Sequence, residues 1–215
     1  MPTSSISICF KGDHCPTELR SIDVITHASA SRELDIFCED KEGQLGGDDM
    51  RLATELVKNT PTLEELCVTV VIDDDQALES FVAAVQQHRG LLALYLQNCG
   101  LGFDHYVLFA VLPAFSCRSI HLNFSGNNIG ARGASLVSIH LALNPPLEQL
   151  LLSDNDIDDG STFALAESMK KNTNLVLLDL MSNLQLTSAG SENLAMTCYA
   201  DHNLNILHDC NYTCT

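Results

Sequence analysis

The sequence predicts an α/β fold of stacked repeats, in which each repeat is a strand, a tight corner and a helix that returns to the start. Leu147, Leu150 and Leu152 lie at offsets 0, +3 and +5, a spacing that predicts a strand with one buried face. Leu165 and Met169 follow four residues apart, which is the spacing of one helix face. The same arrangement recurs every 28 residues, at repeat starts Leu63, Leu91, Ser119, Leu147 and Leu175.

The period divides the chain into three stretches. The first thirty residues do not fit the repeat, and alternation in Ile6–Phe10 and in Ile22–Val24 predicts two short strands that cap the stack. A degenerate first repeat begins near Ser31, and a last partial repeat opens at Leu204 with Leu207 at +3. We therefore expect one domain made of a cap at 1–30, repeats at 31–203 and a C-terminal partial repeat or cap at 204–215.

Asparagine at offset +8 is expected to have a structural role. The backbone leaves the strand there, so its amide groups lose their ladder partners. A buried asparagine carries two donors and one acceptor, so Asn127, Asn155 and Asn183 can satisfy these groups and pair with the neighbouring repeat. Cys99 is a weaker substitute in the same slot, and Val71 cannot act in this way, so we expect an irregular corner at Val71.

These residues resemble leucine-rich repeats, and the 28-residue period with a helical second half is similar to the ribonuclease-inhibitor-like subclass. The resemblance spans about Ser31 to Leu207, nearly the whole chain outside the two caps. It implies a curved, right-handed α/β solenoid with a parallel sheet on the concave face and helices on the convex face. It also implies a scaffold that binds proteins rather than a catalyst.

Side chains at offsets +2, +4 and +6 are expected to point out of the concave face, because side chains alternate along a strand. The N-terminal part of this face is acidic and its C-terminal part is apolar, with Leu151, Leu177 and Met181 expected side by side. Exposed apolar clusters rimmed by polar groups often mark interfaces, although single exposed leucines are common. We predict partner binding on this face, with Tyr95 as an anchor. The predicted contact residues are Asp35, Phe37, Tyr95, Gln97, His121, Asn123, Leu151, Leu177, Asp179 and Met181.

The composition opposes nucleic-acid and membrane partners. A net charge of −17, from 28 acidic and 11 basic residues, opposes a phosphate backbone, so we expect no nucleic-acid binding. The same charge fits either a solvated surface or a basic protein partner steered by charge. No run reaches the roughly 18 apolar residues of a membrane helix, so we expect no membrane insertion. The lack of a secretory signal and the odd number of cysteines, 9, indicate a reducing, cytoplasmic location.

No sequence pattern predicts a metal, cofactor or catalytic site. The stretch Asp154–Gly160 resembles a calcium loop, but its glycine is seventh and its twelfth residue is Leu165, so we reject calcium. Phosphate-loop, serine-hydrolase and zinc-protease motifs are lacking, and we expect no enzyme and no cofactor. Five potential zinc ligands near the C-terminus lack a C-x-x-C spacing, and we interpret them as cap residues: Cys198, His202, His208, Cys210 and Cys214.

The sequence thus predicts a non-catalytic interaction module, or a subunit of an assembly, that binds a protein partner through its concave sheet. Two alternatives remain open. One is a regulator of an enzyme, such as an activator of a small GTPase, which would require more repeats and an acidic tail. The other is a structural subunit that docks through its helices.

Overall fold

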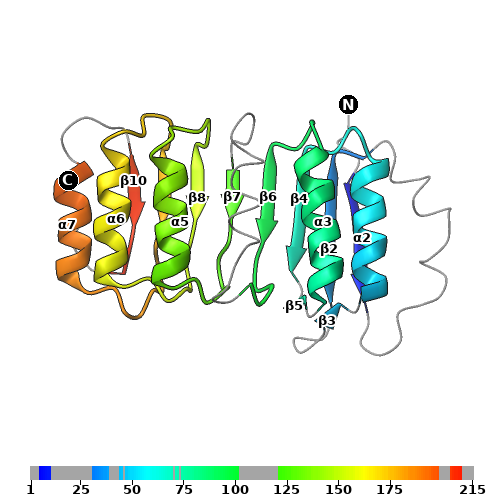
Figure 1. Cartoon of the computed structure of the whole chain (residues 1–215), viewed down its shortest axis with the longest axis horizontal. Helices are drawn as coiled ribbons and strands as arrows, with labels where there is room; N and C mark the ends of the chain where they lie inside the picture. The colour runs from blue at the N-terminus through cyan, green and yellow to red at the C-terminus, as the bar shows by residue number, and fades with distance from the viewer. Residues whose placement is uncertain are drawn as a thin grey trace. The chain divides into compact units, whose positions relative to one another are not determined.

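The computed structural model places strands and helices in the alternating order that the repeat predicts (Figure 1). It describes residues 5–10, 31–38, 44–45, 47–69, 71–72, 74–101, 121–198 and 204–209. The chain divides into two compact units, Met1–Gly100 and Leu101–Thr215, and each is described by itself. The single domain expected from the sequence therefore stays a prediction.

The first unit is a parallel sheet in which helices connect successive strands along the chain. Its strands pair in the order β1, β2, β4 and β6, each parallel to the next. The elements are β1 (Ser5–Phe10), β2 (Glu33–Cys38), β3 (Gln44–Leu45), α2 (Gly47–Asn59), β4 (Glu65–Thr69), β5 (Val71–Ile72), α3 (Asp75–Gln87) and β6 (Ala93–Leu96). Val71 and Ile72, where an irregular corner is expected, form the short strand β5, which pairs with β3 in a separate two-stranded sheet.

The second unit repeats the same pattern with shorter strands. Its strands pair in parallel in chain order, and its helices pack one against the next on one side of the sheet (Figure 1). The elements are β7 (His121–Asn123), α5 (Ala131–Leu141), β8 (Gln149–Leu151), α6 (Asp159–Met169), β9 (Leu177–Asp179), α7 (Ser188–Cys198) and β10 (Asn205–Leu207).

The leucines of the repeat pattern form the core. Leu147, Leu150 and Leu152 are at most 1% exposed, and so are Leu165 and Met169 on the following helix. Burial of these apolar side chains between strand and helix is the main favourable contribution to folding. The strand and helix faces predicted from the spacing are therefore confirmed.

The buried asparagine at offset +8 satisfies the backbone of its corner. The Oδ1 atom of Asn155 accepts hydrogen bonds from the backbone N–H groups of Asn127, at 3.1 Å, and Ile129, at 2.8 Å. Its Nδ2 atom donates to the carbonyl oxygens of Phe124, at 3.1 Å, and Leu152, at 3.0 Å. Phe124 and Leu152 lie in successive repeats, so one side chain joins both corners, as the sequence predicts.

Asn183 and Cys99 fill the same slot in other repeats. Asn183 donates from Nδ2 to the carbonyl oxygen of Leu152, 31 residues earlier, at 3.0 Å, and accepts at Oδ1 from the N–H of Ile157 at 3.0 Å. The Cys99 thiol donates to the carbonyl oxygen of Val68, also 31 residues earlier, at 3.2 Å. Because a thiol is a weak donor and a weak acceptor, cysteine supplies only part of what asparagine supplies.

The residue at offset +7 has a left-handed backbone conformation. Its φ angle is 53° at Asn98, 71° at Gly126, 52° at Asp154 and 58° at Ser182. Gly, Asn and Asp tolerate this region better than other residues. Asp154 is therefore explained by backbone geometry, which accounts for part of the acid-rich corner that resembles a calcium loop.

Asp158 accounts for another part of that corner, because it caps α6. Its carboxylate accepts hydrogen bonds from the hydroxyl of Ser161, at 2.6 Å, and from the backbone N–H of Ser161, at 2.8 Å. These two hydrogen bonds hold the pKa of Asp158 below its ordinary value, because they favour the ionised form. Asp158 is therefore the N-cap of α6.

Replacing Asp158 by alanine is expected to lower the free energy of unfolding of the second unit by about 1 kcal/mol, because α6 loses its N-cap. The folded pKa lies below the ordinary 3.8, so the carboxylate stabilises fully above that pH and loses its effect as the pH falls through the folded value. Urea denaturation followed by circular dichroism, at pH 7 and at lower pH, measures both effects. Asp158→Asn keeps an acceptor, and an equal loss in that variant would contradict capping.

The strand β1 continues the repeat register. Ile6 pairs with Leu34 and Ile8 pairs with Ile36, each 28 residues further along the chain. β1 therefore forms the first of the two strands predicted in the cap, and it continues the sheet in the register of the repeat. The second strand expected there, at Ile22–Val24, lies outside the described residues.

The strand β10 corrects the register of the last repeat. Ile206 pairs with Leu178, and Leu207 pairs with Asp179. Ile206 therefore takes offset +3 at the regular 28-residue period, and the partial repeat opens one residue before Leu204. Leu207, expected at that core offset, takes an outward one, because leucine and isoleucine suit the core equally and only the strand ladder distinguishes the two registers.

Candidate interaction surface

The helices lie on one side of the strands, and we define the opposite side as the outer face (Figure 1). Alternation along the strands assigns the predicted contact residues with described side chains to this face. Most of them are half-buried between neighbouring strands: Asp35, Tyr95, Gln97, His121, Leu151, Leu177 and Asp179. Met181 is exposed and Asn123 is buried. The side chain of Phe37 lies outside the described residues. Because Tyr95 and Leu151 belong to different units, the acidic and apolar parts of the outer face are described separately.

In the first unit, acidic side chains surround Cys67 and Tyr95. Glu33 pairs with Glu65 on the next strand, and Asp35, Cys67 and Tyr95 form the next row of the register. Directly opposed like charges oppose folding slightly, so this arrangement gives the face a negative potential at a small cost in stability. Such a surface attracts cationic groups and raises their rate of association.

The pKa values of two neutral groups are raised on this acidic surface. Burial raises the pKa of the Tyr95 phenol, and nearby Glu65 and Cys67 raise it further. Burial also raises the pKa of the Cys67 thiol; a hydrogen-bond contact with Thr69, at 3.6 Å, opposes this rise, and Asp35 adds to it. Both groups are therefore uncharged near pH 7, and the negative charge of the face comes from the carboxylates.

Cys67 is expected to react with iodoacetamide at neutral pH several-fold more slowly than a free cysteine, because less of it is thiolate. Mass spectrometry of the alkylated peptide over time measures the rate. Asp35→Asn should speed the reaction slightly, since it removes one cause of the raised pKa. A rate in the folded protein equal to that of the urea-unfolded chain would contradict the account.

In the second unit, apolar side chains alternate with an acid. Leu151 pairs directly with Asp179 on the next strand. Leu177 lies two residues before Asp179 on β9, and Met181 lies two residues after it, just beyond the end of β9. They are therefore diagonal neighbours of Leu151, not side by side as expected from the sequence. Leu207, on β10, pairs with Asp179 on the strand edge opposite β8. It adds a fourth apolar residue, which the sequence predicts in the core. We call Leu151, Leu177, Met181 and Leu207 the apolar sheet patch.

Asn123, a predicted contact residue, has a local structural role instead. It is 6% exposed, and its Oδ1 atom accepts a hydrogen bond from the N–H of Ser125 at 2.9 Å. Asp179, at the same offset, accepts from the N–H of Met181 at 2.9 Å. Asn and Asp commonly bond to the backbone two residues on, so this offset stabilises the end of the strand. Asp179 stays half-buried, so it remains within reach of the outer face.

The structure adds little on metal sites. Among the described residues, no group of three or more His, Cys, Asp or Glu side chains is placed to hold a metal ion. Of the five potential zinc ligands, only His208 has a described side chain, and it is half-buried beside β10.

No helix in the described part of the chain has the length and hydropathy to cross a membrane.

Comparison with known families supports the repeat assignment. The family model described as "Leucine Rich repeat" matches residues 117–138, a stretch that includes β7, the Asn127 corner and the first eight residues of α5. No curated protein matches the chain. The match and the repeated strand, corner and helix together support a leucine-rich repeat protein with an α/β solenoid fold. This class suggests a module for protein–protein interaction, typically without catalytic activity.

Proposed function

We propose that the chain is a non-catalytic module that binds a protein partner through the outer face of its sheets. The apolar sheet patch carries this proposal, because Leu151, Leu177, Met181 and Leu207 gather around Asp179 on the side of the sheet away from the described helices. Apolar side chains beside a fixed polar group are typical of the centre of a protein interface. A partner that covers the patch would remove this apolar surface from water.

We also propose that the partner presents basic residues to the first unit, in a reducing, cytoplasmic setting. The acidic cluster of Glu33, Asp35 and Glu65 on β2 and β4 supports this, since cations would relieve its like-charge repulsion. The 28-residue period and the 11-residue helices support the ribonuclease-inhibitor-like subclass as the class of repeat.

The test compares capture of partners from the native source by the wild type and by two matched variants. Leu151→Asp with Met181→Asp places two charges on the apolar sheet patch and is expected to reduce capture at least tenfold. Ile139→Asp with Phe163→Asp places two charges on the helices and is expected to leave capture unchanged. Both variants should keep the wild-type melting temperature within a few degrees, because none of the four side chains is fully buried.

Equal capture by the wild type and the sheet variant would refute the proposal. Loss of capture only in the helix variant would favour the alternative in which the subunit docks through its helices. If a basic partner contacts the acidic cluster, Glu65→Lys should also weaken capture, and the wild-type complex should weaken as salt is raised.

A further inference from the structure

The most exposed of the large apolar side chains in the described part of the chain is Leu184, in the corner between β9 and α7. Leu184 is 95% exposed, and Met181, just beyond the end of β9, is 42% exposed. Asn183 closes this corner from within, through hydrogen bonds to the carbonyl oxygens of Leu152 and Leu180, and Leu184 adds no packing to that closure. A single exposed leucine needs no explanation, so its neighbours decide whether the corner is a binding surface.

Hydrogen bonds place an exposed carboxylate on each side of this corner. In the preceding repeat, the backbone N–H of Asp154 donates to the carbonyl oxygen of Met181 at 2.9 Å. On the other side, the carboxylate of Asp209 accepts a hydrogen bond from the backbone N–H of Ser182. Both acids are exposed. We define the corner surface as these side chains together with the acid that takes the offset of Leu184 one repeat earlier: Asp154, Asp156, Met181, Leu184 and Asp209.

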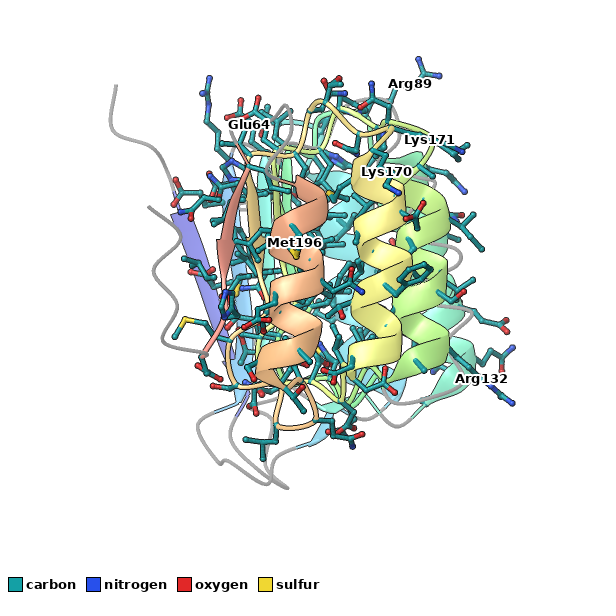
Figure 2. All side chains as sticks on the ribbon, turned by 90° about the vertical axis from the view of Figure 1, so that its left-hand side faces the viewer. Glu64, Arg89, Arg132, Lys170, Lys171 and Met196 are labelled. Carbon is teal, nitrogen blue, oxygen red and sulfur yellow. The ribbon has the colours of Figure 1, made fainter. Side chains whose placement is uncertain are left out.

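No Lys or Arg side chain lies on the described corners of the second unit, at 124–130, 152–158, 180–187 and 208–209. Lys170 and Lys171 follow α6, an 11-residue helix, so they lie about 16 Å from the corner that precedes it. Figure 2 shows both of them at the opposite end of the helices from Arg132. Arg132 follows the corner two repeats before Leu184, about 10 Å away across the strands. The corner surface therefore keeps a net negative charge.

The chemistry of the corner surface fits a segment that is both apolar and basic. A large apolar side chain laid against Met181 and Leu184 would leave water together with them. Lysine and arginine fit the surroundings, since their methylene stems cover apolar surface while their charged heads reach nearby carboxylates. A second copy of this chain, with its net charge of −17, and a phosphate backbone would both bring negative charge to the same acids.

We propose that the corner surface binds a basic segment of the protein partner, with one large apolar side chain against Met181 and Leu184 and cationic side chains against the three acids. This binding mode rests on the proposed function, because Met181 belongs to both the apolar sheet patch and the corner surface. The partner would then extend from the outer face of the sheet onto the corners that follow β8 and β9. Opposite charges steer the segment to the surface, and apolar contact holds it there.

Salt is expected to weaken this contact. Ions screen the attraction between exposed charges over a Debye length of about 10 Å at 0.1 M. Apolar contact does not weaken in this way, so the loss of affinity with added salt measures the contribution of the three acids.

Selection from a random library of peptides about 15 residues long, displayed on phage, tests the chemistry of the segment. The wild-type chain is the target, and peptides that bind equally to the Leu184→Gln variant are removed. The remaining peptides are expected to carry a large apolar residue with Lys or Arg within a few positions of it. Fluorescence anisotropy of the synthetic peptides, at low and at physiological salt, then gives their dissociation constants.

These peptides are expected to bind Asp154→Asn with Asp156→Asn severalfold more weakly than the wild type, and with less dependence on salt. Asparagine tolerates the left-handed backbone at Asp154, where φ is 52°, so this variant should keep its fold. Glu167→Gln with Glu192→Gln is the matched control, because it removes the same charge from the helices and should bind as the wild type does. Leu143→Gln is the control for Leu184→Gln, since Leu143 is 74% exposed just after α5.

A library that yields no peptide dependent on Leu184 would overturn the proposal, and so would dependent peptides that lack Lys and Arg or bind both acid variants equally. Circular dichroism of each variant verifies that the fold is retained. The proposed function fails on a different result, which is equal capture of the native partner by the wild type and the Leu151→Asp with Met181→Asp variant. A native partner lost by that variant but captured normally by Leu184→Gln would contradict the corner surface alone.

Discussion

Replacing Asn155 by alanine is expected to lower the free energy of unfolding of the second unit by about 3 kcal/mol. The change removes the acceptor of two buried N–H groups, those of Asn127 and Ile129. It also removes the donor to the carbonyl oxygens of Phe124 and Leu152, on two successive repeats. The two carbonyl oxygens keep a second donor, Asn127 for Phe124 and Asn183 for Leu152. The main cost therefore comes from the two N–H groups that lose their acceptor, at about 1–3 kcal/mol each.

Urea denaturation of wild type and variant, followed by circular dichroism, measures this loss. Asn128→Gly is the matched control, because Asn128 lies in the preceding corner, is exposed, and has a φ of 52° that glycine adopts easily. We expect the control to change stability by less than about 0.5 kcal/mol. A loss below about 1 kcal/mol for Asn155→Ala would mean that water replaces the amide, and that the asparagine is not needed to close the corner.

Replacing Phe124 by alanine is expected to lower the free energy of unfolding by about 4 kcal/mol. Phe124 takes offset +5 of its repeat and is completely buried. The change removes a ring from a close-packed interior. The backbone at this position cannot move to close the cavity, because the carbonyl oxygen of Phe124 itself accepts hydrogen bonds from Asn127 and Asn155.

Phe124→Leu is the matched control, because Leu152 and Leu180 fill the same offset in the next two repeats. Leucine should therefore cost only about 1 kcal/mol. Both variants are compared by urea denaturation under identical conditions. Equal losses for leucine and alanine would show that this position requires the aromatic shape itself, and would contradict its treatment as an ordinary core slot of the repeat.

The strand faces, the corners and the helix faces could be predicted because each depends on local spacing. Leu150 and Leu152 fall on one side of a strand for the same reason in every repeat, and Asn155 meets the same unpaired amide groups wherever the strand ends. A fixed period also reveals an exception such as Cys99, whose thiol donates to the carbonyl oxygen that asparagine contacts in other repeats.

The registers of the terminal strands could not be predicted from spacing alone. Ile6 and Ile8 align with core residues of β2, but no leucine at the repeat start marks them. At the other end, the sequence offers Leu207 and Ile206 as equal candidates for one core offset, and only the pairing of β10 with β9 chooses Ile206. The choice matters for function, because it moves Leu207 into the apolar sheet patch.

The candidate site was predicted less well than the fold, since exposure depends on neighbours. Asn123 takes an outward offset yet is buried, because its side chain turns back to the N–H of Ser125. A second asparagine position also went unnoticed: Asn172, in the connection from helix to strand, donates to the carbonyl oxygen of Leu141 at 3.0 Å and accepts from the N–H of Leu175 at 2.9 Å. The signal for it was Asn144, 28 residues earlier.

Oxidative footprinting of the complex captured from the native source tests the central proposal most directly. Met181 and Met196 are both exposed, the first on the outer face of the sheet and the second on α7, so they form an internal comparison. Binding through the outer face predicts that the partner slows oxidation of Met181 severalfold while the rate at Met196 does not change. Protection of Met196 by the partner, with Met181 oxidised as fast as in the unbound protein, would contradict it.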